Sequence, residues 1–479
     1  MIHSLGRPVD QARARRRPQK GLSTCVLVSA GDVFRCGPSV SSYSSNRVRR
    51  AAVSPLPTIT PVLEDRVFTR IAWRLMPLLI VAYVLNYLDR NNLGFAALTM
   101  NRELGLTTTQ FGRAAGILFL GYCFFEVPSN IALYRVGPRI WLARIMISWG
   151  LISAGTIFVT GSMSLYLLRF LLGVAEAGFF PGVAFYLGTW FPSAYRTRMI
   201  AWFMVAVPIS SVVAGPVSGL LLQMDGIAGL SGWKWLFLLE GLPVALLGLA
   251  MLKVLSDRPE TATWLSDDER KVVSNRIHSE RREKEVRHLG AALKDARVLI
   301  LAGVQFGFLV GSYGVGLFLP QIIKLGKLSD LEVGFVSSGC YVVATVGMIV
   351  WAGQVDKRGG KVVNLTLACL TSAIGFAGAI ASSNFWVSLT FVTVALTGIN
   401  AARGIFWTIP PRFLTGLAAA GGLAFINSVG TMGGFVGPYL MGWLTDRTGS
   451  FSAGLGAMAG FLLLATGLSW SLKLFVKQD

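Results

Sequence analysis

The stretch from Trp73 to Ala97 reads WRLMPLLIVAYVLNYLDRNNLGFAA and decides the fold class. A helix needs about 20 apolar residues to cross a bilayer, and this stretch is long enough to do so. It also contains two adjacent charged residues, Asp89 and Arg90. Charges inside an apolar helix are costly and usually mark a functional pathway. The stretch therefore predicts a membrane helix that brings charged groups into the protein interior.

Further apolar stretches follow this one along the chain, separated by short polar breaks. They are residues 110–133, 140–160, 164–187, 198–223, 233–254, 297–322, 331–354, 361–380, 385–409, 416–443 and 451–475. Together with the first stretch they make twelve, which need roughly 240 residues for the membrane crossings alone. The sequence predicts an all-α membrane protein with twelve transmembrane helices.

The composition excludes several classes of protein. Hydrophobic residues make up 53% of the 479 residues and charged residues 14%, against about 25% charged residues in a soluble domain. Such a chain cannot cover itself with polar surface in water, which excludes a soluble enzyme and a disordered protein. The net charge of +20 is compatible with nucleic-acid binding. Most basic residues lie between apolar stretches, however, so we expect contact with membrane lipid and not with nucleic acid.

The chain divides into four parts by composition. Two apolar blocks, 61–254 and 297–479, contain six predicted helices each, and a hydrophilic linker, 255–296, joins them. Residues 1–60 are rich in Arg and Ser and poor in acids. Three interpretations of this segment stay open: a disordered basic tail, an extension from a misplaced start codon, and a mitochondrial transit peptide.

The two apolar blocks repeat each other. Arg135-Val136-Gly137 follows the second predicted helix, and Lys357-Arg358-Gly359 follows the eighth, 222 residues later. Gly215-Pro216 recurs as Gly437-Pro438 with the same offset. A shared offset at two places predicts two homologous six-helix halves, as in major facilitators.

The distribution of basic residues predicts the orientation in the membrane. Basic residues flank the helices on one side, and the opposite loops are nearly uncharged, with Lys324, Lys327 and Arg447 as exceptions. Because cytoplasmic loops carry an excess of Lys and Arg, we expect both termini in the cytoplasm and the protein in a bacterial inner membrane.

Two predicted helices each carry one acid and one guanidinium. Asp89 and Arg90 lie on the first helix, and Arg169 and Glu176 lie on one face of the fourth helix, two turns apart. A guanidinium matches the planar carboxylate group, and an acid beside it can exchange a proton. These residues predict that an organic anion moves together with protons. The alternative is that the four charges pair only with one another and hold the helices together.

Four other polar residues in the apolar helices are candidates for functional roles. Glu126 is expected in a gate contact or a helix cap, and Glu240 in a structural contact. Arg403 lies one turn from Trp407, and substrate contact and snorkelling to the cytoplasm are both open for it. Asn427 is expected to bond a substrate hydroxyl or a neighbouring helix.

No motif indicates an enzyme or a bound cofactor. The five cysteines show no CxxC spacing, and the three histidines are too few for a His-rich metal site. The chain contains no GxxxxGK[ST] sequence for ATP and no GxSxG nucleophile motif. We expect no enzyme activity, no cofactor, no metal and a monomeric protein.

Several motifs resemble a known family. Tyr87-Leu88-Asp89-Arg90, the segment RFLLGVAEAGFFP at 169–181 and Trp190-Phe191-Pro192 are similar to the anion:cation symporter branch of the major facilitator superfamily. The resemblance covers residues 62–479. Within the branch, FEVPSN at 125–130 and INSVG at 426–430 resemble bacterial tartrate transporters. Related members carry hexonates, phthalate or nicotinate.

The resemblance implies roles for individual residues. Proton coupling is implied for Asp89 and Glu176, and anion binding for Arg90 and Arg169. The remaining pocket residues implied by the family are aromatic or amide side chains: Tyr87, Tyr122, Trp407 and Asn427.

The same resemblance implies a gate and a function. The family's gate motif contains an Asp. In the first half of this chain Tyr134 stands at that position, next to Arg135, whereas the second half keeps the Asp as Asp356. We therefore expect an asymmetric gate formed by Glu126, Arg135 and Asp356. The implied function is proton-coupled import of a small hydroxylated carboxylate, such as tartrate or a sugar acid. An antiporter or uniporter without proton coupling, and a membrane anion sensor, stay as alternatives.

Overall fold

The computed structural model describes residues 61–281, 295–414 and 416–475. The prediction for the N-terminal segment 1–60 lies outside the described residues. In the described ranges, every regular element is a helix, which confirms the all-α prediction.

The first half contains six membrane-crossing segments. They are α1 (Pro61–Glu103), α2 (Thr108–Val136), α3 (Pro138–Ala154) with η1 (Gly155–Phe158), α4 (Ser162–Glu176) with α5 (Phe179–Trp190), α6 (Ser193–Met204) with α7 (Ala206–Leu222), and α8 (Gly232–Val254). A short turn, η2 (Ile227–Gly229), precedes α8. Two of the predicted single helices are therefore each divided into two shorter ones.

The second half contains six long helices. They are α11 (Ala296–Lys324), α12 (Asp330–Arg358), α13 (Lys361–Ala381), α14 (Phe385–Phe406), α15 (Gly416–Thr448) and α16 (Phe451–Ser471), with the turns η4 (Pro410–Arg412) and η5 (Leu472–Leu474). Across the described residues, 11 segments are long and apolar enough to cross a membrane. The twelfth is α15, which has 33 residues but contains many glycines and polar residues such as Asn427. With α15 included, the predicted count of twelve is confirmed.

The ends of α2 and α12 display the internal repeat. Both helices have 29 residues and begin 222 positions apart. Each begins with a capping box, formed by Thr107 with Gln110 and by Ser329 with Glu332. Side-chain caps of this kind satisfy backbone N–H groups that the first turn leaves unpaired. The repeat thus extends from the sequence motif to the local chemistry that starts each helix.

The described part of the linker packs against the first half. Helix α9 (Asp267–Arg281) follows the turn η3 (Pro259–Thr261). The Arg70 guanidinium lies 2.9 Å from a Glu269 carboxylate oxygen, and Trp264 stacks on Trp190 with ring centroids 5.5 Å apart. The Arg70–Glu269 ion pair and a second one between Arg276 and Glu64 join α9 to the first turns of α1, which begins before the predicted Trp73. We call this end of the molecule the α9 end, and the opposite end the far end.

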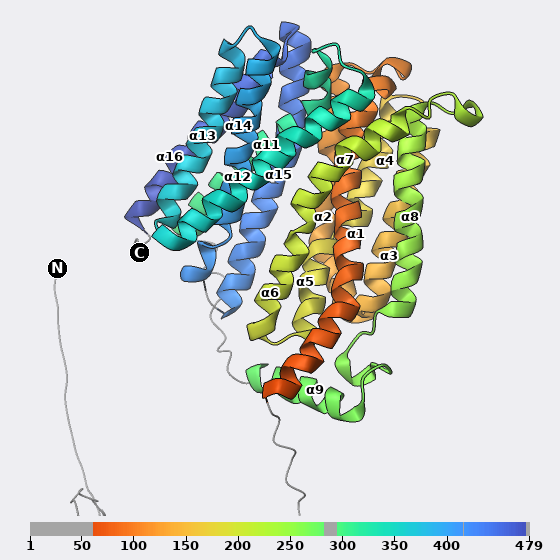
Figure 1. The fold of residues 1–479 in the computed structure, drawn as a ribbon, viewed down its shortest axis with the longest axis vertical. Coiled ribbons are helices and arrows are strands. Elements are labelled where there is room, and N and C mark those ends of the chain that lie inside the picture. The colour runs from red at the N-terminus through yellow and green to blue at the C-terminus, as the bar shows by residue number, and fades with distance from the viewer. Residues whose placement is uncertain (1–60, 282–294, 415, 476–479) are drawn as a thin grey trace, which may run out of the picture. The chain divides into compact units, whose positions relative to one another are not determined.

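The two halves meet along three helix pairs, α2 with α15, α7 with α12, and α1 with α11. Glycines allow the close approach: a Cβ atom on Gly112 would collide with the Pro438 carbonyl, and one on Gly334 with the Gly215 carbonyl. Figure 1 shows α7 and α12 crossing near the far end and diverging toward the α9 end.

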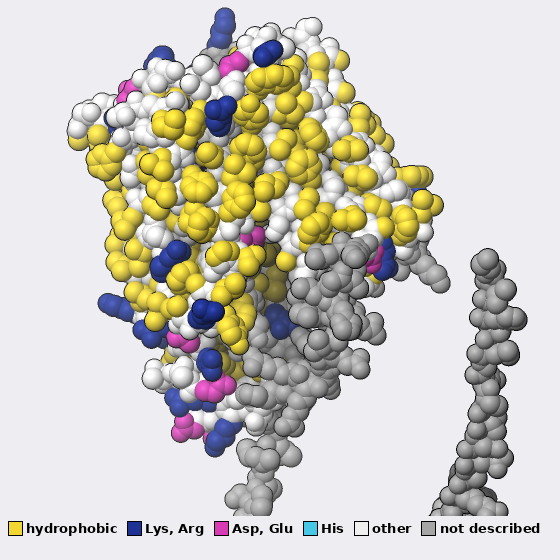
Figure 2. All heavy atoms as spheres, turned by 180° about the vertical axis from the view of Figure 1, so that it is seen from behind, with side chains coloured by type: hydrophobic (Ala, Val, Ile, Leu, Met, Phe, Trp, Pro, Cys, Tyr) yellow, Lys and Arg dark blue, Asp and Glu magenta, His cyan; other side chains and the backbone are white. Residues whose placement is uncertain are grey.

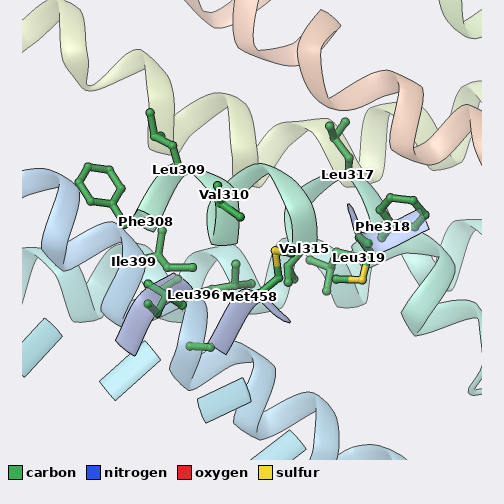
Figure 3. Packing of buried hydrophobic residues seen from close by; sticks show 14 of the residues in the cluster. Phe308, Leu309, Val310, Val315, Leu317, Phe318, Leu319, Leu396, Ile399 and Met458 are labelled. Atoms are coloured by element: carbon green, nitrogen blue, oxygen red, sulfur yellow. The ribbon is translucent and has the colours of Figure 1, made fainter. Parts of the chain in front are cut away.

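Apolar side chains fill the interior and also cover the outside. Helix α11 lies in the core of the second half, where residues such as Phe308, Val310 and Phe318 pack against Ile399 and Met458 (Figure 3). Figure 2 shows a broad apolar band on one face, with many of the visible Lys and Arg side chains toward the α9 end. Exposed apolar side chains of this extent fit a lipid environment, and the protein is an integral membrane protein.

Candidate functional site

A break between α4 and α5 positions the buried acid Glu176. Helix α4 ends at Glu176, and Gly178 follows with φ 86° and ψ 0°, a conformation that favours glycine. The Ser129 hydroxyl donates a hydrogen bond to the Ala177 carbonyl at 2.6 Å, and the Trp141 indole donates to that hydroxyl at 3.0 Å. The break therefore has its own supporting hydrogen bonds, which hold Glu176 at the end of a half-helix.

Glu176 pairs with Arg90 on a different helix. Arg90 Nε lies 2.9 Å from Glu176 Oε2, and the Asn86 amide donates to the same oxygen at 3.1 Å. The Glu176 side chain is 0% exposed and that of Arg90 is 13% exposed. The second oxygen, Oε1, has no hydrogen-bond partner among the described residues. The ion pair thus crosses from α1 to α4.

Asp89 points away from its neighbour Arg90 and toward α3. Its carboxylate accepts hydrogen bonds from the Trp149 indole at 2.9 Å and the Asn92 amide at 3.1 Å, and a further one from the Ser153 hydroxyl. Its side chain is buried. Consecutive helical residues are turned by about 100°, which explains why Asp89 and Arg90 have different partners. The four charges interact with one another in a crossed arrangement, Arg90 with Glu176 and Arg169 with both acids, so the alternative that they hold the helices together stays open.

Arg169 is buried between the two acids. It is 2% exposed, and it interacts electrostatically with Asp89 and Glu176. In the described part of the chain, its Nε and Nη1 atoms have no hydrogen-bond partner. Arg169 is not among the residues that line the cavity between the halves. Its position fits charge compensation of the acids better than direct contact with a ligand.

A small cavity lies between the halves. The first half contributes Tyr87, Arg90, Asn91 and Ser211, and the polar residues from the second half are Ser312, Tyr313, Tyr341, Asn400 and Arg403. Arg403 thus lines the cavity, where both substrate contact and snorkelling were open from the sequence. Two guanidiniums from opposite halves therefore line one mostly polar space.

Aromatic rings surround Arg90. Its guanidinium carbon lies 5.0 Å from the ring centre of Tyr122 and 5.6 Å from that of Tyr87. Rings at this distance attract a cation through their faces. The structure therefore brings both predicted pocket tyrosines to the predicted anion-binding arginine.

Other candidate residues lie outside the cavity lining. The Asn427 amide donates to Glu126 Oε1 at 3.3 Å, which joins α2 to α15 across the halves. Trp407 is 38% exposed at the end of α14, against Phe406. Arg135 and Asp356 are exposed at the ends of α2 and α12, and no ion pair joins them in the described ranges.

Glu240 is a further buried acid of the first half. It accepts a hydrogen bond from the Ser218 hydroxyl at 3.3 Å, which agrees with its expected structural contact.

Sequence reasoning missed several residues of this site. Asn86, Trp149 and Ser153 hold the acids, and Ser312 and Tyr313 line the cavity from α11. Each is a polar or aromatic residue inside an apolar stretch, which was the available signal. That signal was weak because such residues also serve ordinary helix packing.

Comparison with known proteins gives a consistent result. Residues 79–438 match the family model described as Major Facilitator Superfamily. A protein of Agrobacterium vitis named "Putative tartrate transporter" is 46% identical over 413 residues, covering 86% of this chain and 92% of the relative. A protein of Acinetobacter baumannii named "Quinolone resistance transporter" is 40% identical, covering 82% of this chain and 91% of the relative.

A solved structure is similar in fold. The crystal structure titled as a D-xylose-proton symporter matches with a TM-score of 0.65 and 16% identity, over 83% of this chain and 97% of the other. At this level of identity the likeness concerns the fold alone.

Proposed function

The chain belongs to the Major Facilitator Superfamily, and on that premise we propose that it is a proton-coupled symporter that imports a small hydroxylated carboxylate. The observation that carries the proposal is the ion pair between Arg90 and Glu176, at 2.9 Å, beside the cavity between the halves. The relatives named as transporters support a small-molecule substrate. The tartrate named for one of them supports the carboxylate class.

The ion pair suggests how proton and anion are coupled. While Glu176 is ionised, its carboxylate occupies the Arg90 guanidinium. A proton on Glu176 neutralises that carboxylate and leaves the guanidinium without a counter-charge, so that binding of a substrate carboxylate becomes favourable. Each of the two ligands then favours binding of the other. This reciprocity is what a symporter requires.

Asp89 supplies a second proton site in the proposed cycle. Its three hydrogen-bond donors, Trp149, Ser153 and Asn92, hold the carboxylate away from the cavity. We assign to Arg169 the role of balancing the charges of Asp89 and Glu176. The carboxylate of the substrate would bind Arg90 directly. Arg169 would affect this binding indirectly, through its interactions with the two acids.

Transport by this fold proceeds by rocking of the halves around a central site. We call the helix pairs α2–α15 and α7–α12 the seams between the halves. Near the far end the seams would close the cavity, whereas α7 and α12 diverge toward the α9 end (Figure 1). We propose that the α9 end faces the cytoplasm of a bacterium, as the basic residues predict. The contact between Glu126 and Asn427 would be one of those exchanged in the cycle, with Arg135 and Asp356 as cytoplasmic gate residues.

The test is transport by purified full-length protein in vesicles, with Glu176→Gln compared with wild type. We expect the variant to lose uptake driven by a pH gradient and to keep exchange of labelled for unlabelled anion. The matched control is Glu103→Gln, because Glu103 pairs with Trp233 and Lys234 outside the cavity.

Two outcomes would contradict the proposal. Full proton-driven uptake by Glu176→Gln would exclude Glu176 as the coupling acid. Wild-type transport that does not respond to a pH gradient would favour the uniporter or antiporter alternative.

A further inference from the structure

The cavity contains a second guanidinium, that of Arg403, which the proposed coupling step does not use. Arg403 Nη2 donates a hydrogen bond to the Ser312 hydroxyl at 2.7 Å. Both side chains line the same cavity as Arg90 but come from the opposite half. Arg403 therefore lines the cavity from the half opposite to that of Arg90.

The two arginines differ in how their charge is balanced. Arg90 has the Glu176 carboxylate as its partner, whereas Arg403 donates to a neutral hydroxyl. Among the described residues, Arg403 forms no ion pair. A partly buried guanidinium without a counter-charge favours an anionic partner. Its fork binds a carboxylate through two parallel hydrogen bonds.

Apart from the two guanidiniums, the polar residues that line the cavity are uncharged. Tyr313 interacts electrostatically with both Arg90 and Arg403, so the space between them is lined by a phenol. Asn400 lies one helical turn before Arg403 and on the same face of α14. The remaining polar lining is made of neutral amide and hydroxyl groups: Asn91, Ser211 and Tyr341. Such groups match hydroxyls on a substrate whose charged ends are held by the arginines.

We propose that Arg403 binds a second carboxylate, and that the transported anion is a short hydroxylated dicarboxylate that bridges the two halves through Arg90 and Arg403. This inference rests on the proposed function, because it takes Arg90 as the site of the first carboxylate. A dianion contacts both halves at once and favours their closure around it. A monoanion satisfies one guanidinium and leaves the other unpaired.

Three probes of equal carbon length test this inference. They are tartrate with two carboxylates, threonate with one carboxylate replaced by a hydroxymethyl group, and threitol with both replaced. Binding to the purified full-length protein is measured by competition against labelled tartrate. For wild type we expect tartrate to bind at least about tenfold more tightly than threonate, because one buried charged contact is lost. Threitol should not compete.

The decisive variant is Arg403→Gln. We expect its tartrate affinity to fall to that of threonate, while its threonate affinity stays within about threefold of wild type. Ser312→Ala, which removes the hydroxyl that holds Arg403, should cause a smaller loss in the same direction. The matched control is Arg198→Gln, because Arg198 packs on Trp202 of the same helix, outside the cavity, and should leave the ratio unchanged.

The possible results separate the inference from the proposed function. An unchanged ratio of tartrate to threonate affinity in Arg403→Gln would overturn the role of Arg403, even if Arg90→Gln abolishes threonate binding. Equal binding of threitol and tartrate to wild type would instead overturn the proposed function itself. If Arg403→Gln does not fold, Arg403→Lys replaces it, and a ratio equal to that of wild type again overturns the inference.

Discussion

The two halves of the molecule share a helical frame but differ in where their charges lie. Helices α2 and α12 have equal lengths and equivalent caps. Yet the buried charged residues among the described positions all belong to the first half: Asp89, Glu126, Arg169, Glu176 and Glu240. The cavity lining of the second half instead combines neutral polar groups with Arg403.

This difference shows how the two halves of a duplicated fold can take on different functions. Backbone caps and glycine contacts are needed for both halves to fold and to meet, so they recur. Side chains at equivalent positions within the helices can differ between the halves, because the residues packed around them also differ. In our interpretation the first half manages protons, and the second half recognises the far side of the substrate.

The largest expected effect comes from Arg90 in the first half. Arg90→Lys should weaken carboxylate binding by about 30-fold or more, since losing a buried charged contact costs roughly 2–5 kcal/mol and 1.4 kcal/mol is a factor of ten. An ammonium cannot reproduce the two parallel bonds of a guanidinium. Competition of labelled tartrate uptake measures the change, with Arg198→Lys as the control, because Arg198 packs on Trp202 outside the cavity. A change of less than threefold would show that Arg90 does not contact the anion.

A second effect compares the two seams between the halves. Gly112→Ala and Gly334→Ala each place a methyl group against the backbone of the opposite half. Forced overpacking costs about 1–3 kcal/mol, so both variants should separate the halves near the far end. Distances between spin labels on the two halves would measure the separation.

The control for the seams is Gly339→Ala on α12, where a Cβ atom meets nothing within 4 Å. If the duplicated frame makes the seams equivalent, Gly112→Ala and Gly334→Ala should shift the distances to a similar degree. A shift in one of them alone would show that the seams have different roles in closure.

A third effect should distinguish the seams, because a carboxylate strengthens the α2–α15 contact. Asp446 accepts hydrogen bonds from the backbone N–H groups of Thr108 at 3.0 Å and Thr109 at 2.7 Å. Asp446→Asn should weaken this cap by about 1 kcal/mol, which shifts the population of the closed seam by roughly fivefold. The same spin-label distances report the shift.

The matched control for Asp446 is Asp225→Asn. Asp225 caps the backbone N–H of Gly232 at 2.8 Å within the first half, so its loss should not change the distance between halves. Equal shifts in the two variants would mean that the effect is general loss of helix stability.

The smallest effect concerns the packing of α9 on the first half. Burial works against ionisation of Glu269, but hydrogen bonds from the Ser266 backbone and from Arg70 outweigh it and lower the pKa of that carboxyl. Its stabilising contribution is therefore present above its unfolded-state pKa of about 4.3 and is lost as the pH falls through the lower folded-state pKa.

The Glu269 contribution should be small, because Arg70 is 58% exposed and exposed ion pairs contribute about 0–1 kcal/mol. Hydrogen exchange of α9 between pH 6 and pH 3 measures it. Glu269→Gln should exchange faster than wild type at pH 6 and equally fast at the lowest pH. An unchanged rate in Glu269→Gln at pH 6 would contradict the assignment.

Much of the fold could be predicted from local patterns. Apolar stretches of sufficient length predicted the helices, and the offset of 222 residues predicted the two halves. The break between α4 and α5 was missed, although Gly178 and Pro181 lie at it, because glycine and proline are also common inside unbroken membrane helices. The break depends on Ser129 and Trp141, which lie on other helices. A local pattern contains no information about such partners.

The sequence by itself determined which chemistry enters the membrane: acids on α1 and α4, arginines beside them, and Arg403 in the second half. Helical periodicity also determined that Asp89 and Arg90 point in different directions. Only the tertiary structure decided the partners. Arg90 meets Glu176 across 86 residues of chain, and Asp89 meets Trp149 across 60. Periodicity specifies a face of one helix, whereas the neighbour of that face is set by how all the helices pack together.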